Sequence, residues 1–198
     1  MSAFENVMLG VNQVYFTASK AERRQMAEYY LTIVGLGDAM LKHPAELSQG
    51  MKQRVGIARA LSIQPKMLLM DEPFSALDAL TRGVLQEEVL RICAETRQTV
   101  FMITHDVDEA ILLADKIILM TNGPRAKIAE IVVNTMPRSR TRHDLHKHPH
   151  YYRIRNHLID FLVDRSKMFS GASAGYDPRN PPLVTPGLDP NEAPAVDP

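Results

Sequence analysis

The sequence predicts an α/β fold, and three observations support this prediction. Residues 67–70 and residues 99–103 are short apolar runs with the length and composition of buried strands. Between these runs, apolar residues recur at helical spacing: Leu80, Val84, Val89 and Ile92. A strand–helix–strand order requires a crossover connection, which predicts that the two strands pair in parallel.

Two helices are predicted before the first strand. Ser19 and Glu22 form a capping-box pattern, apolar residues at helical spacing follow, and Gly35 can end this helix. A second helix begins at Ser48, because a hydroxyl there can accept backbone N–H groups and no proline intervenes before Pro65. Ser48 is therefore interpreted as a helix cap before any other role is considered.

After the second strand the sequence predicts a short helix, a hairpin and a last helix. Asp106 can cap the short helix. Residues 116–121 and 127–133 have the pattern of two strands that flank an Asn-Gly-Pro turn. Residues 151–163 place apolar side chains on one helical face, which indicates an amphipathic helix that docks on the domain.

Composition excludes two classes of protein. The 23 basic and 23 acidic side chains cancel, so the chain has no excess of positive charge for binding nucleic acid, and we expect no nucleic-acid partner. The longest apolar runs are far shorter than the roughly 20 residues that cross a bilayer.

The single cysteine, Cys93, cannot form an internal disulfide, and no signal-peptide pattern is visible. These features favour a cytoplasmic location.

Two adjacent carboxylates, Asp71 and Glu72, follow the first predicted strand. In an open parallel sheet, ligands bind at this edge. An aspartate there can hold Mg2+ through its water shell, and the next glutamate can orient or deprotonate a water that attacks a γ-phosphate. Taken alone, the two residues leave open the alternative that they only cap the next segment.

Three further motifs flank these carboxylates. In chain order, the four motifs are Leu-Ser-Gln-Gly-Met-Lys-Gln-Arg at residues 47–54, Asp-Glu at 71–72, Ser-Ala-Leu-Asp at 75–78 and Thr-His-Asp at 104–106. In order and spacing they resemble the signature sequence, Walker B strand, D-loop and switch histidine of the ABC ATPase family. The resemblance covers about residues 4–133. It implies a partial nucleotide-binding domain, with a RecA-like parallel sheet and a helical subdomain, followed by a C-terminal hairpin and helix.

The resemblance implies ATP and Mg2+ as ligands and a role for each hydrolytic residue. Glu72 would be the general base, and Asp71 would hold Mg2+ through water. His105 would hydrogen-bond the γ-phosphate and hold the attacking water in place. Catalysis of this kind depends mainly on positioning and charge stabilisation.

The resemblance also implies a partner subunit, because the family places two ATP molecules between two ATPase subunits. Ser48, Gln49 and Gly50 would contact the ATP of the opposite subunit from the start of a helix. Asp78 would carry contacts across the dimer. Gln49 replaces a common glycine and Met51 a common polar residue, but neither change removes a phosphate contact.

No Gly-x-x-x-x-Gly-Lys-Ser/Thr loop occurs in the 198 residues. That loop cradles the β- and γ-phosphates, so we interpret the chain as an amino-terminally truncated ABC-type transport ATPase that lacks the phosphate loop for its own nucleotide. Truncation would remove sheet partners, so residues 67–70 and 99–103 are expected to have unpaired edges or exposed apolar faces.

The predicted parts are a helical subdomain remnant at residues 1–47, the ATPase core at 48–135, a C-terminal loop and amphipathic helix at 136–170, and a tail at 171–198. Seven of the 13 prolines lie at residues 177–198, which predicts that the tail is disordered. Four histidines between residues 143 and 150 lie among basic residues that would repel a cation, so this segment is interpreted as a solvated loop.

Residues 103–110, the Asn-Gly-Pro turn and the last helix resemble ATPases of the nitrate, cyanate, bicarbonate and sulfonate importers. This implies a subunit that energises uptake of nitrate or a related small anion, peripheral on the inner face of the membrane and bound to transmembrane permease subunits. Two alternatives stay open. One is a non-catalytic regulatory subunit without its own nucleotide site. The other is an ABC-type DNA-repair or chromosome-organising ATPase, which the neutral charge and the lack of a coiled-coil insertion disfavour.

Overall fold

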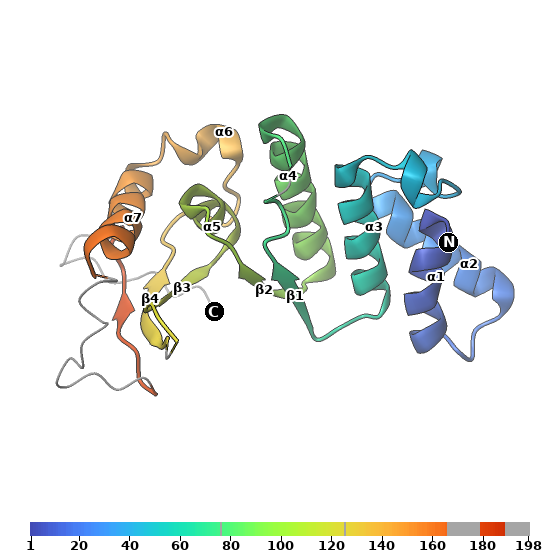
Figure 1. Ribbon diagram of the computed structural model, residues 1–198, viewed down its shortest axis with the longest axis horizontal. Coiled ribbons are helices and arrows are strands. Elements are labelled where there is room, and N and C mark those ends of the chain that lie inside the picture. Colours follow the sequence, from blue (N-terminus) through green and yellow to red (C-terminus); the bar gives the residue numbers. More distant parts are fainter. Residues whose placement is uncertain (76, 125, 166–178, 189–198) are drawn as a thin grey trace. The chain divides into compact units, whose positions relative to one another are not determined.

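The computed structural model describes residues 1–75, 77–124, 126–165 and 179–188 (Figure 1). These residues divide between a first unit, residues 1–103, and a second unit, residues 104–198. Among the described residues, no helix is long and apolar enough to cross a membrane. The predicted domain boundaries at residues 47, 135 and 170 stay predictions.

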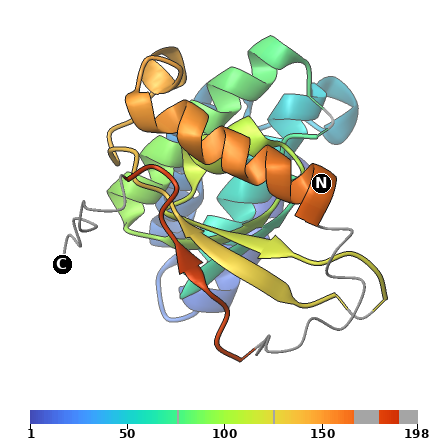
Figure 2. The same ribbon diagram turned by 90° about the vertical axis from the view of Figure 1, so that its left-hand side faces the viewer.

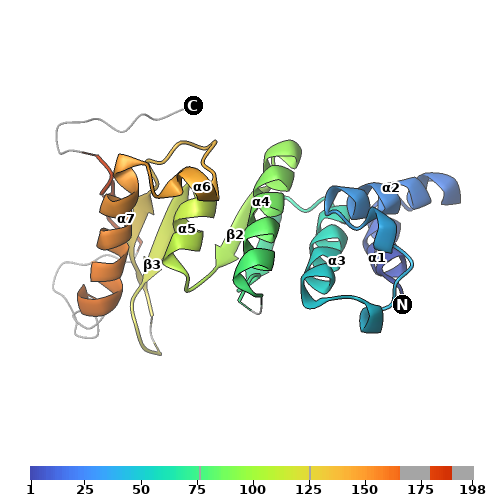
Figure 3. The ribbon, with the colours of Figure 1, turned by 90° about the horizontal axis from the view of Figure 1, so that it is seen from above.

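The first unit begins with three helices: α1 (Ala3–Val14), α2 (Lys20–Ile33) and α3 (Gln49–Ser62). They pack against one another (Figure 3). Two short 3-10 turns, Gly37–Ala39 and Pro44–Glu46, connect α2 to α3. At Gly10, α1 approaches α3 so closely that a Cβ would lie 2.1 Å from the Ser62 Oγ. A glycine is therefore required at this crossing.

Capping boxes begin α1 and α2. Ser19 and Glu22 exchange backbone and side-chain hydrogen bonds at the start of α2, which confirms the predicted start of that helix. Ser2 and Glu5 make the same pair of bonds at the start of α1. Helix α1 was not among the predicted elements, although the same Ser-x-x-Glu pattern stands at its start.

Strands β1 (Met67–Asp71) and β2 (Thr99–Ile103) pair in parallel, with Leu69 opposite Phe101 and Asp71 opposite Ile103. Helix α4 (Ala79–Thr96) is the crossover between them, as predicted. In the part of the chain that the structure describes, β1 and β2 pair only with each other. The prediction of a parallel strand–helix–strand unit is confirmed.

One face of the β1–β2 sheet is apolar and exposed. Leu68 and Met70 point to the covered face and are 6% and 8% exposed. On the opposite face, four apolar side chains are between 46% and 70% exposed: Met67, Leu69, Phe101 and Ile103. The expectation of an exposed apolar face is confirmed here, whereas the prediction that both strands are buried is wrong for this face.

The second unit contains α5 (Val107–Leu113), the antiparallel strands β3 (Lys116–Met120) and β4 (Ile128–Val133), α6 (Arg142–Leu145) and α7 (Pro149–Asp160). A π-helical turn, Phe161–Arg165, continues α7. The predicted hairpin and last helix are confirmed. The predicted loop before α7 holds the single turn of α6.

Helix α7 lies across the β3–β4 hairpin (Figure 2). Its covered face carries Ile154 and Leu158, and Phe161 of the π-helical turn continues it; all three side chains are at most 1% exposed. Leu162, which lies within the predicted amphipathic helix of residues 151–163, is exposed. Helix α7 therefore has the amphipathic pattern that the sequence predicted, apart from its last turn.

A short strand from the predicted disordered tail pairs with β4. β5 (Leu183–Val184) lies parallel to β4, and the Ile131 N–H donates to the Pro182 carbonyl oxygen at 2.9 Å (Figure 2). A proline has no backbone N–H to donate to a sheet, but its carbonyl oxygen can accept a hydrogen bond. The prediction of disorder is therefore wrong for residues 179–188, while residues 171–178 and 189–198 lie outside the described residues.

Adjacent leucines of β1 test the two faces of the sheet. Leu68→Ala removes a buried side chain and is expected to lower the free energy of unfolding by about 2–5 kcal/mol. Leu69→Ala removes an exposed side chain and is expected to change it by at most about 0.5 kcal/mol. Urea unfolding followed by circular dichroism measures both, and equal losses would contradict the assignment of the exposed face.

Candidate functional site

Helix α3 begins at the predicted signature sequence. The Ser48 Oγ accepts a hydrogen bond from the Met51 N–H at 3.2 Å, and the Lys52 N–H donates to the Ser48 carbonyl oxygen at 3.0 Å. The predicted cap is therefore confirmed. The N–H groups of Gln49 and Gly50 precede that first intrahelical bond, at the positive end of the helix dipole. The start of α3 thus has the geometry and charge that anions favour.

The Ser48 hydroxyl retains a donor after capping the helix. The Ser48 Oγ accepts a hydrogen bond from the Met51 N–H, and the hydroxyl proton of Ser48 can still be donated to another group. Ser48 is exposed, so its O–H can reach a ligand from outside the helix. Capping and phosphate binding are therefore compatible at this residue, and they use different parts of the hydroxyl group.

Gly50 has a packing role in this structure. A Cβ on Gly50 would lie 2.8 Å from the Thr81 Cγ2, on the first turn of α4. The absence of a side chain therefore allows the start of α3 to pack against the start of α4. From the sequence, Gly50 was predicted to contact the ATP of an opposite subunit, and this packing role was not expected.

Asp78 caps α4. Its Oδ1 accepts hydrogen bonds from the Leu80 N–H at 3.1 Å and the Thr81 N–H at 3.0 Å. Hydrogen bonds from the side chain and backbone of Thr81 lower the pKa of the exposed Asp78 carboxyl. Asp78 therefore has a structural task, and its contact across a dimer stays a prediction. Ala76 of the same motif lies outside the described residues.

The two adjacent carboxylates differ in backbone conformation. Asp71 is the last residue of β1 and is exposed, whereas Glu72 has φ 45°, in the left-handed region. The Glu72 N–H donates to the Ile103 carbonyl oxygen at 2.9 Å, and the Glu72 carbonyl oxygen accepts from the Ser75 Oγ at 3.0 Å. This conformation costs roughly 1–2 kcal/mol for a non-glycine residue, and such strain concentrates at functional sites.

A hollow of about 330 Å³ lies between α3 and β1. Lys52 and Gln53 border it from α3, and Asp71 and Pro73 border it at the end of β1. The Asp71 carboxylate thus stands at an open space large enough for several waters. A hard oxygen ligand with room for water is the donor set that Mg2+ prefers, so this residue fits the predicted water-mediated contact.

In the second unit, His105 is exposed and lies between two residues that are bonded to the first turn of α5. The Thr104 Oγ1 donates to the Glu109 carboxylate at 2.7 Å and accepts from the Asp106 N–H at 3.0 Å. The Asp106 Oδ1 accepts from the N–H groups of Asp108 and Glu109, both at 3.0 Å. The predicted cap at Asp106 is confirmed, and the backbone around His105 is held from both sides.

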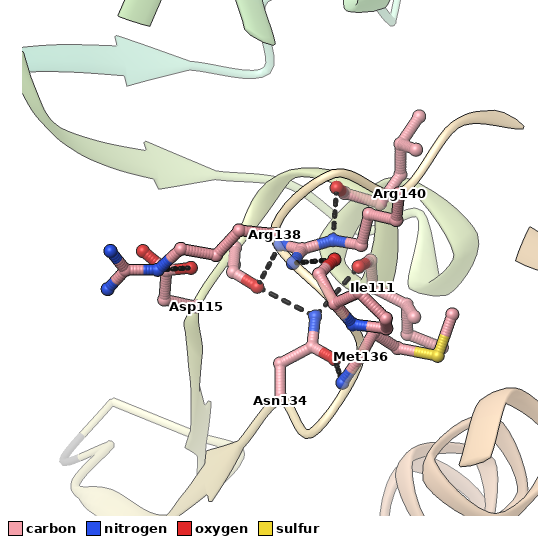
Figure 4. Close-up of polar contacts among 9 residues, drawn as sticks. Ile111, Asp115, Asn134, Met136, Arg138 and Arg140 are labelled. Atoms are coloured by element: carbon pink, nitrogen blue, oxygen red, sulfur yellow. Dashed lines mark hydrogen bonds and ion pairs between the residues drawn. The ribbon is translucent and has the colours of Figure 1, made fainter. Parts of the chain in front are cut away.

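Two side chains from the segment after β4 cap the other end of α5 (Figure 4). The Asn134 Nδ2 donates to the Ile111 and Ala114 carbonyl oxygens at 2.8 and 2.7 Å. The Arg140 Nε donates to the Leu112 carbonyl oxygen and its Nη2 to the Ala114 carbonyl oxygen, both at 2.7 Å. Burial lowers the pKa of the Arg140 guanidinium, which nevertheless places a cation where the helix dipole is negative.

Helix α7 contacts the first turn of α5 through one carboxylate. The Tyr151 hydroxyl donates to the Asp108 Oδ1 at 2.7 Å, and the Arg155 Nε donates to the same oxygen at 3.0 Å. Burial and the Asp108 carboxylate raise the pKa of Tyr151. Neither α7 donor was predicted from the sequence, because nothing in the local pattern indicates that Asp108 is their partner.

The histidines before α7 make local contacts. The His146 ring packs edge-on against Tyr151, with 4.6 Å between ring centroids. The His148 Nδ1 accepts from the His150 N–H, and the His150 Nδ1 lies 3.3 Å from the Thr135 carbonyl oxygen. Within the described ranges, no group of three or more potential ligand side chains could hold a metal ion.

Comparison with known proteins gives relatives of one kind. Residues 1–75 match the family described as ABC transporter. The bicarbonate transport ATP-binding protein CmpD of Synechocystis sp. is 50% identical over 165 residues, which are 83% of this chain and 58% of CmpD. The nitrate import ATP-binding protein NrtC of Synechococcus elongatus is 51% identical over 163 residues, 82% of this chain and 25% of NrtC. The nitrate transport protein NasD of Klebsiella oxytoca is 49% identical over 166 residues, 83% of this chain and 63% of NasD.

Solved structures give the same result. An inward-facing conformation of a metal-chelate type ABC transporter matches with a TM-score of 0.55 and 27% identity, over 60% of this chain and 49% of that one. A dimeric ATP-binding cassette in a post-hydrolysis state, bound to ADP and phosphate, matches with a TM-score of 0.50 and 34% identity, over 60% and 51%. The chain spans between 25% and 63% of the length of the three sequence relatives.

The cap at Ser48 can be tested apart from the predicted phosphate contact by substitution. Ser48→Ala removes the cap and is expected to lower the free energy of unfolding by about 1 kcal/mol. Ser48→Asp keeps a cap acceptor of equal quality, so the free energy of unfolding is expected to stay within about 0.5 kcal/mol of the original. Urea unfolding measures both variants. An unchanged free energy of unfolding in Ser48→Ala would show that the cap contributes nothing to the stability of the fold.

Proposed function

We propose that the chain is part of an ABC transporter ATPase and that it supplies the hydrolytic and partner-facing residues of an ATPase that energises uptake of a small anion. The observation that carries this proposal is the order and spacing of the four motifs along the chain, with Asp71 and Glu72 at the end of β1. The relatives named for bicarbonate and nitrate transport support a small oxyanion as the transported substrate. Nitrate is the anion that we propose first.

Glu72 is the proposed general base for the water that attacks the γ-phosphate. Its strained backbone, held by Ile103 and Ser75, favours a defined position for the carboxylate. His105 is the proposed hydrogen-bond partner of the γ-phosphate and of the attacking water. It is exposed, as a residue that contacts a ligand from the end of a strand must be.

Asp71 would hold Mg2+ through water, beside the hollow between α3 and β1. When bound, Mg2+ neutralises charge that develops on the phosphate oxygens. Asp71 is a single carboxylate on an exposed strand end, so it can orient coordinated waters without enclosing the ion.

Ser48, Gln49 and Gly50 are proposed to contact an ATP molecule held by a second ATPase subunit. The Ser48 hydroxyl and the first N–H groups of α3 supply donors, and the helix dipole favours the negative phosphate. Asp78 begins the helix that packs against Gly50, so it is proposed to extend the same surface toward the partner. Transmembrane permease subunits would bind the assembled ATPase on the cytoplasmic side of the membrane.

A second candidate is a non-catalytic subunit that donates the start of α3 to a partner's ATP. The exposed Ser48 hydroxyl and the first N–H groups of α3 are the groups that this role requires. A subunit of this kind has no use for a general base, however. The strained Glu72 and the structured surroundings of His105 therefore favour the catalytic proposal.

A hybrid protein tests the proposal. The 165 residues of CmpD that match this chain are replaced by the corresponding residues of this chain, and the hybrid keeps the remainder of CmpD. We expect the hybrid to hydrolyse Mg-ATP and to restore bicarbonate uptake in a strain that lacks CmpD. Glu72→Gln in the hybrid is expected to lower ATP hydrolysis by about 10²-fold or more, with ATP binding retained.

The matched control is Glu87→Gln, which neutralises an exposed carboxylate on α4 and should leave hydrolysis unchanged. A Glu72→Gln hybrid that hydrolyses ATP at the original rate would contradict the assigned base. A folded hybrid that binds ATP without hydrolysing it, while CmpD is active, would favour the non-catalytic candidate.

A further inference from the structure

Helix α5 depends on contacts from elsewhere in the second unit. It has seven residues, and isolated helices shorter than about 12 residues are marginal in water. His105 immediately precedes its cap residue, Asp106. The position of His105 therefore depends in part on that of the first turn of α5.

The first turn of α5 is bound by two donors from one face of α7. Tyr151 and Arg155 are four residues apart, so their side chains lie on the same side of the helix. Both donate to the Asp108 Oδ1, at 2.7 and 3.0 Å. Tyr151 is 1% exposed, and the edge-on ring of His146 limits its movement.

The last turn of α5 is also held by side-chain hydrogen bonds. Asn134 and Arg140 donate four hydrogen bonds of 2.7 to 2.8 Å to its terminal carbonyl oxygens (Figure 4). α5 therefore cannot slide along its axis without losing these bonds. At the first turn, the Asp108 contact with α7 adds to the bonds that Thr104 and Asp106 make.

We propose that Tyr151 and Arg155 are positioning residues for His105, which they orient through Asp108 and the first turn of α5. This inference rests on the proposed role of His105 at the γ-phosphate. The path consists of contacts within the second unit: α7 holds Asp108, the Asp108 and Glu109 N–H groups bind Asp106, and Glu109 binds Thr104. The last helix of this chain thus contributes to the ATPase site without touching the nucleotide.

The 198-residue chain itself, labelled at its histidine rings, provides the test. His105→Gln identifies the ring signals of His105 in the NMR spectrum. Tyr151→Phe removes one hydroxyl and keeps the buried ring, so the variant is expected to fold. Loss of a hydrogen bond to a charged acceptor is expected to speed amide exchange in α5 roughly tenfold. The His105 ring signals are expected to shift in native conditions, while the exchange of β4 amides stays unchanged.

The matched control is Tyr152→Phe, which removes the hydroxyl of the neighbouring exposed tyrosine and should change neither readout. Arg155→Gln is a second variant, which removes the cation from the contact with Asp108. The His105 ring signals are expected to shift in this variant as well. Unchanged His105 signals in Tyr151→Phe overturn the proposal. Equally faster exchange throughout the second unit, with unchanged His105 signals, shows a purely structural role and overturns it as well.

The NMR readout requires no nucleotide, so it separates this inference from the proposed function. Unchanged His105 signals contradict the positioning role even where the CmpD hybrid is active. An inactive hybrid contradicts the proposed function, and the response of the His105 ring to Tyr151→Phe is then still measured on its own.

Discussion

The hydrogen bond from the Glu72 N–H to the Ile103 carbonyl oxygen is the constraint on which the proposed chemistry of the first unit depends. It continues the parallel β1–β2 pairing one residue past the pair of Asp71 and Ile103. Because Glu72 has a positive φ, the chain leaves the strand direction at this bond, and Ser75 fixes the turn that follows. A single strand pairing therefore determines where the two carboxylates lie, and Ile103 is also the last residue before Thr104 and His105.

The remaining predicted site residues are helix caps or lie next to one. Ser48 caps α3, Asp78 caps α4 and Asp106, next to His105, caps α5. A cap must be polar and lie at an exposed helix start, which is also where backbone N–H groups and the helix dipole attract phosphate. The same residues can therefore build the fold and the ligand surface, and only substitutions that separate the two tasks distinguish them.

The sequence predicted those parts of the fold that depend on neighbouring residues. The cap patterns at Ser19, Ser48 and Asp106 are local, and the predicted α/β fold class agrees with the ABC structures that this chain matches. The Ser2 capping box was equally readable and was missed. The prediction of a disordered tail was wrong at β5, because proline content says nothing of an edge strand that accepts hydrogen bonds at a proline carbonyl.

The contacts that hold α5 could not be predicted from the sequence. Their partners lie between 20 and 47 residues apart, as in the bond from Asn134 to Ala114 and the ion pair of Arg155 with Asp108. No periodic pattern or short motif links such pairs before the chain is folded. The exposure of the sheet face around Leu69 could not be read from the strand sequence either. A strand sequence shows that a side chain is apolar, but it does not show whether another element covers that side chain.

Hydrolysis by mixed subunits is the most direct test of the central claim, that Glu72 serves the ATP of its own subunit while Ser48 serves that of the partner. A Glu72→Gln hybrid and a Ser48→Asp hybrid are each expected to be inactive, because the aspartate caps α3 but repels phosphate and donates no proton. Mixed in equal amounts, they form dimers in which one of the two sites is intact, so roughly a quarter of the original ATPase rate should return. A mixture that is no more active than either variant alone would contradict the account.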